Sequence, residues 1–174
     1  MIRVDPLARP EPLIRRVYAY AAYRLGDGAD AEDATSDTFE RALRYRSSYD
    51  RSKGEPVAWL LGIARRCVDD LLETRPPVSE LDYDVAAPGD LEPDLIRDLT
   101  VRRAVLGLDA RSRELVALRY GADLTARQIA ELLGERTNTV EVALHRALGR
   151  LRAVLESERP RPAPGRASLP ENAH

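Results

Sequence analysis

The stretch Leu124-Thr125-Ala126-Arg127-Gln128-Ile129 carries the clearest structural signal in this sequence. Thr125 and Gln128 have the spacing of a capping box, in which the side chain of each residue bonds to the backbone N–H of the other. Leu124 and Ile129 are placed to pack against each other as a hydrophobic staple across the same turn. The stretch therefore predicts that a helix begins at Ala126.

The residues that follow predict a second helix. Gly134 suits the left-handed position that ends a helix, and the next helix is expected to start after Glu135-Arg136-Thr137. Its apolar residues recur with helical spacing and form the face that would pack on the core: Val140, Leu144, Ala147, Leu148 and Leu151. Two short helices joined by a tight turn that contains glycine predict a helix-turn-helix.

The opposite face of this second helix carries side chains that can contact DNA. Near the helix start, Asn138 can pair with an adenine edge and Val142 can touch a thymine methyl group, while Arg146 is better placed for phosphate. The candidate DNA-binding residues of the motif are Arg127, Asn138, Thr139, Val142, His145 and Arg146. A plain helical hairpin with a solvated outer face is the alternative interpretation.

Helical periodicity extends over two blocks of the chain, residues 13–72 and 99–155, with almost no strand-type alternation. Three helices are expected in the first block. One ends before Gly26, the next is capped by Asp30 and runs to about Tyr45, and the third begins with Pro56 in its first turn.

The segment between the blocks and the end of the chain have a different composition. Residues 75–98 are acidic and contain proline, which predicts a flexible linker, and the proline-rich end predicts a disordered tail. The sequence thus predicts an all-α protein with two small helical domains. The expected segments are a first domain at 13–74, a linker at 75–98, a second domain at 99–156 and a tail at 157–174.

Composition argues against several classes of protein. The chain has 174 residues, a hydrophobic fraction of 44% and a formal net charge of −2. One cysteine, Cys67, and two histidines supply neither a disulfide nor a zinc site, and no glycine-rich phosphate loop is present, so no cofactor and no enzymatic activity are expected. No long apolar run predicts a signal peptide or a membrane span, so a cytoplasmic location is expected.

Two further stretches carry candidate chemistry. The loop from Tyr45 to Gly54 interleaves aromatic, basic and hydroxyl side chains, which can stack an unpaired base and hold its backbone. A polar surface loop, with Trp59 in the core, explains the same residues equally well. The stretch from Asp30 to Arg41 is acidic, which favours a basic protein partner over DNA, and a solvated helix surface is its simpler explanation.

In this order, the segments resemble the extracytoplasmic-function sigma factors of bacterial RNA polymerase. The similar motifs are Asp30-Ala31-Glu32-Asp33 with Phe39, then Trp59-Leu60 with Ile63-Ala64-Arg65, and then the helix-turn-helix from Leu124 through Ala147. Each motif is modest by itself, but three in the correct order over most of the chain are specific.

The resemblance implies a transcription initiation factor that binds core RNA polymerase and promoter DNA. Its first domain would dock on the polymerase clamp helices and open the minus-ten element, and its second would bind the minus-thirty-five element and the polymerase flap. The implied polymerase contacts are Asp33, Ser36, Asp37 and Glu40. The implied contacts to the melted strand are Tyr45, Arg46, Tyr49, Arg51, Lys53, Trp59, Arg65 and Arg66.

Departures from the family pattern leave an alternative open. Glu141, Val142 and Ala143 stand where the family often has basic and hydroxyl residues, which predicts weak DNA binding by the isolated second domain. The alternative is a sigma-like regulatory or interaction module that binds polymerase or a partner without directing promoters. A response-regulator activator would need strands in the first block, which shows none. The sequence leaves open the promoter, the inducing signal, the existence of an anti-sigma factor and whether the free protein is closed.

Overall fold

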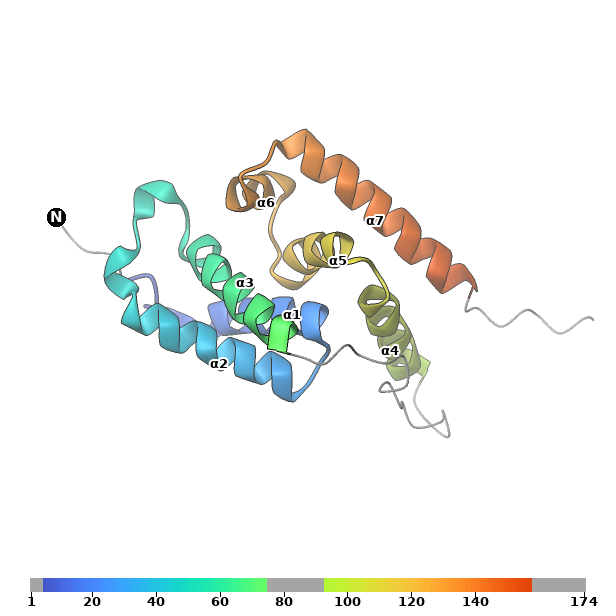
Figure 1. Ribbon diagram of the computed structural model, residues 1–174, viewed down its shortest axis with the longest axis horizontal. Helices are drawn as coiled ribbons and strands as arrows, with labels where there is room; N and C mark the ends of the chain where they lie inside the picture. Colours follow the sequence, from blue (N-terminus) through green and yellow to red (C-terminus); the bar gives the residue numbers. More distant parts are fainter. Residues whose placement is uncertain (1–4, 75–92, 158–174) are drawn as a thin grey trace, which may run out of the picture.

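The computed structural model describes residues 5–74 and 93–157, with side chains from Thr100 onward in the second range. All regular structure in the described residues is helical, which confirms the predicted all-α class (Figure 1). The first block contains α1 (Pro10–Leu25), α2 (Ala29–Arg44), two single turns η1 (Arg46–Ser48) and η2 (Arg51–Lys53), and α3 (Pro56–Thr74). The second contains α4 (Pro93–Leu106), α5 (Ala110–Val116), the π-helical segment η3 (Ala117–Gly121), α6 (Ala126–Leu133) and α7 (Thr137–Ser157).

The helix ends follow local chemistry in most places. The α6 start has the full capping box, and Gly134 ends the helix in the left-handed region at φ 69°, as predicted. The expected cap at Asp30 is wrong, because α2 begins at Ala29 and its N-cap is Gly28 at φ 125°. A backbone of that conformation favours glycine, so the helix is capped two residues earlier than an Asp30 cap would place it.

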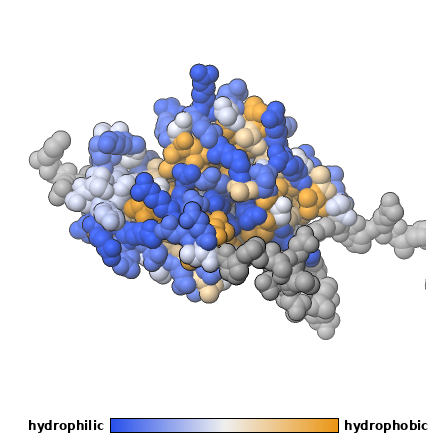
Figure 2. Space-filling view, in the orientation of Figure 1, coloured by the Kyte–Doolittle hydropathy of each residue, from blue (hydrophilic) through white to orange (hydrophobic). Residues whose placement is uncertain are grey.

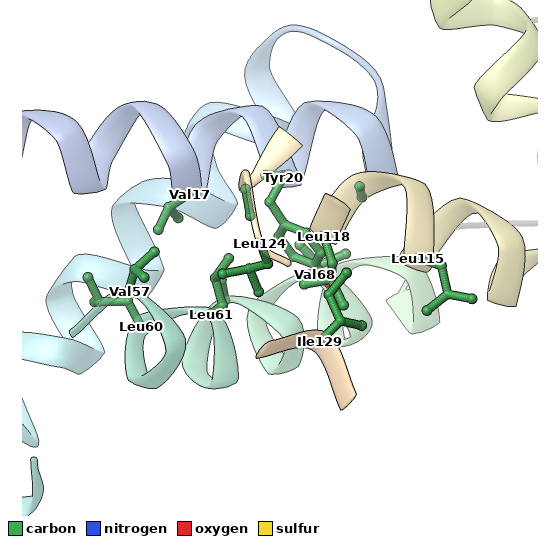
Figure 3. Close-up of a cluster of buried hydrophobic side chains, with 14 of the residues drawn as sticks. Val17, Tyr20, Val57, Leu60, Leu61, Val68, Leu115, Leu118, Leu124 and Ile129 are labelled. Carbon is green, nitrogen blue, oxygen red and sulfur yellow. The ribbon is translucent and has the colours of Figure 1, made fainter. Parts of the chain in front are cut away.

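The two blocks share one hydrophobic core. Figure 3 shows Val17 and Tyr20 of α1 in one cluster with Leu118 of η3 and with Leu124, all with no exposed surface. The backbones also approach closely, since a Cβ added to Gly121 would lie 2.9 Å from the carbonyl oxygen of Ala19. The free protein is therefore closed in this structure, with the second block packed on α1 and α3 of the first.

The segment between the blocks differs from the expected linker at one end. Helix α4 begins at Pro93, inside the range 75–98 that its acidic, proline-containing sequence assigned to a linker. Residues 75–92 lie outside the described part of the chain, as do those from 158 on. The proposed domain boundaries and the predicted tail therefore stay predictions.

Candidate nucleic-acid and polymerase interface

The helix-turn-helix is built from α6 and α7. At its start, the Gln128 N–H donates to the Thr125 hydroxyl at 3.2 Å, and the Thr125 N–H donates to the Gln128 side chain at 2.9 Å. Ile129 and Leu124 are fully buried beneath this turn. These contacts fix the direction in which the chain enters α6, and Gly134, at φ 69°, ends the helix before the turn to α7.

The outer face of α7 is free for a ligand. Val140, Leu144 and Ala147 are buried on the inner face, which confirms that the apolar stripe packs inward. The predicted contact residues lie exposed on the outer face: Asn138, Thr139, Val142, His145 and Arg146. Arg127, on α6, is also exposed and pairs with Glu131 of the same helix at 2.9 Å. A helix that presents polar side chains and one valine in this way can enter a major groove.

The loop after α2 is ordered by its own side chains. The Tyr49 hydroxyl donates to the Gly54 carbonyl at 3.1 Å, and its ring lies 5.7 Å from the ring of Trp59, centroid to centroid, with planes tilted by 60°. The Ser52 N–H and hydroxyl both donate to the Asp50 carboxylate, and these bonds hold the pKa of Asp50 below its usual value. The loop is therefore ordered by its own contacts and offers a preformed surface.

The aromatic and basic side chains of this loop are placed differently from one another. Trp59 is partly buried against the core and its ring also contacts Tyr49, so it lies where the core meets the loop, and its role in holding DNA stays a prediction. Tyr45 is 54% exposed and borders a hollow of about 420 Å³ together with Arg41, Arg44, Ile63 and Arg66. The other predicted basic residues of the loop lie exposed at the surface: Arg46, Arg51 and Lys53.

The acidic helix α2 has two distinct faces. Its inner face buries small side chains against the first block: Ala31, Ala34, Thr35, Thr38 and Ala42. The predicted polymerase contacts all lie on the exposed face: Asp33, Ser36, Asp37 and Glu40. Asp37 and Glu40 each pair with an arginine one turn later in the helix, at 3.6 and 2.8 Å. Exposed pairs of this kind are weak, so a basic partner can compete for the acids.

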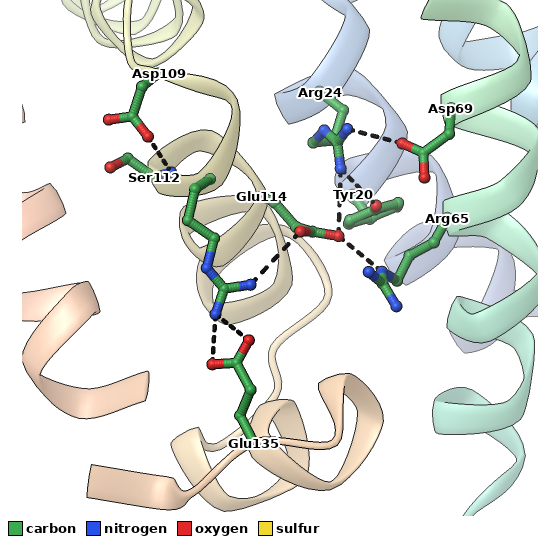
Figure 4. Close-up of polar contacts among 9 residues, drawn as sticks. Tyr20, Arg24, Arg65, Asp69, Asp109, Ser112, Glu114 and Glu135 are labelled. Atoms are coloured by element: carbon green, nitrogen blue, oxygen red, sulfur yellow. Dashed lines mark hydrogen bonds and ion pairs between the residues drawn. The ribbon is translucent and has the colours of Figure 1, made fainter. Parts of the chain in front are cut away.

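Arg65 and Arg66 are placed differently from each other. The Arg65 guanidinium donates to the Glu114 carboxylate of α5 at 2.7 Å (Figure 4) and is half-buried, whereas Arg66 is exposed. Helical geometry explains why Arg65 and Arg66 differ, because neighbouring residues point about 100° apart around a helix. Here Arg65 is the one that faces the second block. In the closed protein Arg65 is therefore paired with Glu114, and its contact with DNA stays a prediction.

Sequence analysis missed Glu114 altogether. Figure 4 shows its carboxylate between Arg24 and Arg65 of the first block, and it also lies 3.8 Å from Arg111 of its own helix. Arg24 further donates to Asp69 at 3.0 Å and to the Tyr20 hydroxyl at 3.1 Å, and burial raises the pKa of Tyr20. The partners lie far apart in sequence, so no local pattern could have indicated the cluster.

Two Sigma-70 family models match the chain, region 2 over residues 11–75 and region 4 over residues 98–151. The ECF RNA polymerase sigma factor SigK of Mycobacterium ulcerans is 30% identical over 151 residues, which cover 82% of this chain and 81% of SigK. The chain belongs to the extracytoplasmic-function RNA polymerase sigma factors. As a member of that family, this sigma factor recognises promoters in partnership with RNA polymerase.

Two solved structures share its fold. One is RpoE of Bartonella quintana, determined with the anti-sigma factor NepR, at a TM-score of 0.66 and 21% identity over 84% of this chain and 94% of that chain. The other is CnrH, determined with the cytosolic domain of CnrY, at a TM-score of 0.62 and 22% identity over 87% of this chain and 86% of that chain. At these identities the likeness concerns the fold.

The rest of the described sigma factor offers little other chemistry. No group of His, Cys, Asp and Glu in the described residues could hold a metal ion. Cys67 is buried, and burial raises the pKa of its thiol, which keeps it in the less reactive protonated form. Among the described helices, none is both long and apolar enough to cross a membrane. Hydrophilic residues cover most of the face seen in Figure 2, with apolar patches between them.

Proposed function

We propose that this sigma factor docks the acidic face of α2 on the polymerase clamp, holds the melted minus-ten strand on the loop 45–54, and lays α7 on the minus-thirty-five duplex. The observation that carries the proposal is the helix-turn-helix itself, whose capping box is complete while the outer face of α7 is bare. The acidic face and the aromatic loop lie exposed on the other block, so one chain can present all three surfaces.

The chemistry of each surface suits its proposed ligand. Glu141 and Val142 lie exposed on α7 where cations would strengthen contact with phosphate, so the helix by itself binds duplex DNA weakly. Stable promoter binding then depends on polymerase, which the acidic α2 face recruits. The factor has no catalytic activity of its own in this proposal and acts in the cytoplasm, where polymerase and chromosome are found.

An anti-sigma factor is part of the proposal as a regulator. Support comes from the solved structure of RpoE, which was determined in complex with the anti-sigma factor NepR. In the described chain, an apolar hollow of about 650 Å³ between α1, α4, α5, η3 and α7 offers an uncovered surface, bordered by Tyr23, Val101, Val116, Tyr120 and Leu151. The alternative of a module that does not direct promoters is not favoured, because both Sigma-70 regions match.

Transcription in vitro tests the proposed function directly. Core polymerase supplied with the factor should start transcripts from a subset of a genomic promoter library, and the double variant Asp33→Lys, Asp37→Lys should not support them. The milder variant Asp33→Asn, Asp37→Asn removes the charge without reversing it, and its transcript yield should lie between those of the wild type and the double lysine variant. Circular dichroism controls for folding. The absence of factor-dependent transcripts from any template in the library would refute the proposed function.

A further inference from the structure

The charged cluster between the blocks is balanced only when they are closed. It contains the cations Arg24, Arg65 and Arg111 and the anions Asp69, Glu114 and Glu135. These are the charged groups that face one another where α1, α3, α5 and the turn after α6 meet (Figure 4). Three cations against three anions leave the cluster without net charge in the closed protein.

Separation of the blocks would divide this balance unequally. The first block would keep Arg24, Arg65 and Asp69, which leaves one cation in excess, and Asp69 already bonds to Arg24 at 3.0 Å. The second block would keep Arg111, Glu114 and Glu135, which leaves one anion in excess. After opening, Arg65 would lose its carboxylate partner, and Glu114 would keep only Arg111, which Glu135 also holds at 2.5 Å.

Burial makes the closed contact costly to alter. The side chain of Glu114 is 13% exposed and that of Arg24 is 7% exposed, whereas Asp69 is 52% exposed. Of the three carboxylates, Glu114 is thus the one enclosed by protein, and three guanidiniums converge on it. Loss of one partner from a buried ion pair strongly destabilises the folded protein. Closure of the two blocks therefore depends on the charge of residue 114.

We propose that Glu114 is an internal competitor of DNA: its carboxylate occupies Arg65 in the closed protein, in the position that a backbone phosphate takes when the blocks separate. A guanidinium binds carboxylate and phosphate through the same paired N–H groups. Arg65 lies next to the exposed Arg66 on α3, so its release enlarges the cationic surface of the first block. This inference rests on the proposed function, since it adds a self-inhibitory contact to the same DNA-binding surface.

The competition has a defined thermodynamic consequence. DNA that binds only the open form shows an affinity reduced by the fraction of molecules that are open. Removal of the Glu114 charge leaves Arg24 and Arg65 facing each other in the closed form without their shared anion. The substitution should therefore raise the open fraction and the affinity for DNA together, although it removes no DNA-binding residue.

The test uses the full-length protein and a fluorescent single-stranded oligonucleotide, without polymerase. Glu114→Gln should bind it at least about fivefold more tightly than wild type, the lower end of typical coupling between sites. Small-angle X-ray scattering should show a larger radius of gyration for the variant. Glu156→Gln makes the same change of charge at an exposed position of α7 and should leave both measurements near the wild-type values.

A double-mutant cycle separates competition from a general gain of positive charge. Arg65→Gln with Glu114→Gln restores neutrality to the cluster, so scattering should return toward the closed value and the gain in DNA affinity should disappear. If Glu114→Gln loses helicity, Glu114→Asp keeps the charge but draws it back from Arg65, and a smaller gain in affinity should remain. Unchanged DNA affinity in a folded, expanded Glu114 variant would overturn the competitor role, as would an affinity gain that survives loss of Arg65.

Failure of the internal competition can be told apart from failure of the proposed function. Transcription with core polymerase, as described above, decides whether the chain works as a sigma factor. A wild-type protein that supports transcription, combined with Glu114 variants that stay closed, would reject only the internal competition. A Glu114 variant that opens and binds the oligonucleotide while no promoter is transcribed would support the competition and reject the proposed function.

Discussion

Replacement of Gly121 by alanine should loosen the contact between the blocks. A Cβ at this position would lie 2.9 Å from the Ala19 carbonyl oxygen and 3.0 Å from the Tyr20 nitrogen, both backbone atoms of α1. Ordinary contacts begin near 3.4 Å, so η3 and α1 must move apart by roughly half an ångström. Overpacking of this kind costs about 1–3 kcal/mol, and the usual gain of about 0.4–1 kcal/mol from Gly→Ala offsets part of it.

The same substitution at Gly149 provides the matched control. Gly149 lies within α7, and an added Cβ would meet no atom within 4 Å. There alanine should stabilise the helix by about 0.5–1 kcal/mol. The two alanine variants should thus change stability in opposite directions. The free energy of unfolding of Gly121→Ala should be about 2 kcal/mol below that of Gly149→Ala.

Urea unfolding followed by tryptophan fluorescence suits this comparison. The single tryptophan, Trp59, lies in the first block, whereas Gly121 lies in the second. A shared core should transmit the damage, so the Trp59 transition of Gly121→Ala should move to lower urea while that of Gly149→Ala does not. A Trp59 transition in Gly121→Ala at or above the wild-type midpoint would refute the shared core and favour two independent domains.

Four further outcomes are expected. Lysine at Asp33 and Asp37 should abolish binding to core polymerase in a pull-down yet leave helicity intact, because it turns an acidic face basic; wild-type binding would contradict the polymerase assignment. Alanine at Tyr49 should reduce permanganate reactivity of minus-ten thymines on paired DNA, because the ring supplies about 1–3 kcal/mol per stacked base. Phenylalanine at Tyr49 keeps the ring and should give a reactivity near that of wild type. Promoter opening by the alanine variant equal to that of wild type would reject the stacking role. Alanine at Thr125 should cost about 1 kcal/mol in thermal unfolding by loss of the α6 cap. The Ser112 N–H holds the pKa of Asp109, the N-cap of α5, below its usual value. The ionised Asp109 carboxylate therefore stabilises the protein above its unfolded pKa of about 3.9, and this contribution is lost as pH falls through the lower folded pKa. The difference in free energy of unfolding between wild type and Asp109→Ala should accordingly disappear only in acid.

Local structure was predictable because its causes lie within a few residues. Thr125 and Gln128 are close enough in sequence that their spacing alone indicates the cap, and Gly134 ends α6 by its own backbone freedom. The expected cap at Asp30 failed for the same kind of reason, because a glycine that allows the turn precedes it at position 28. The predicted contact residues on α7 are exposed because a helical stripe fixes which face turns inward.

Closure of the two blocks could not be predicted, since it depends on groups that sequence does not bring together. Arg65 and Glu114 are 49 positions apart, and Arg16 donates to the carbonyl of Ala122 across 106 positions. Apolar periodicity indicates that a helix face is buried but not which helix covers it. Packing of the second block on the first therefore pairs the half-buried Arg65 with Glu114 of α5, although its motif, beside Arg66, suggested that both arginines face DNA.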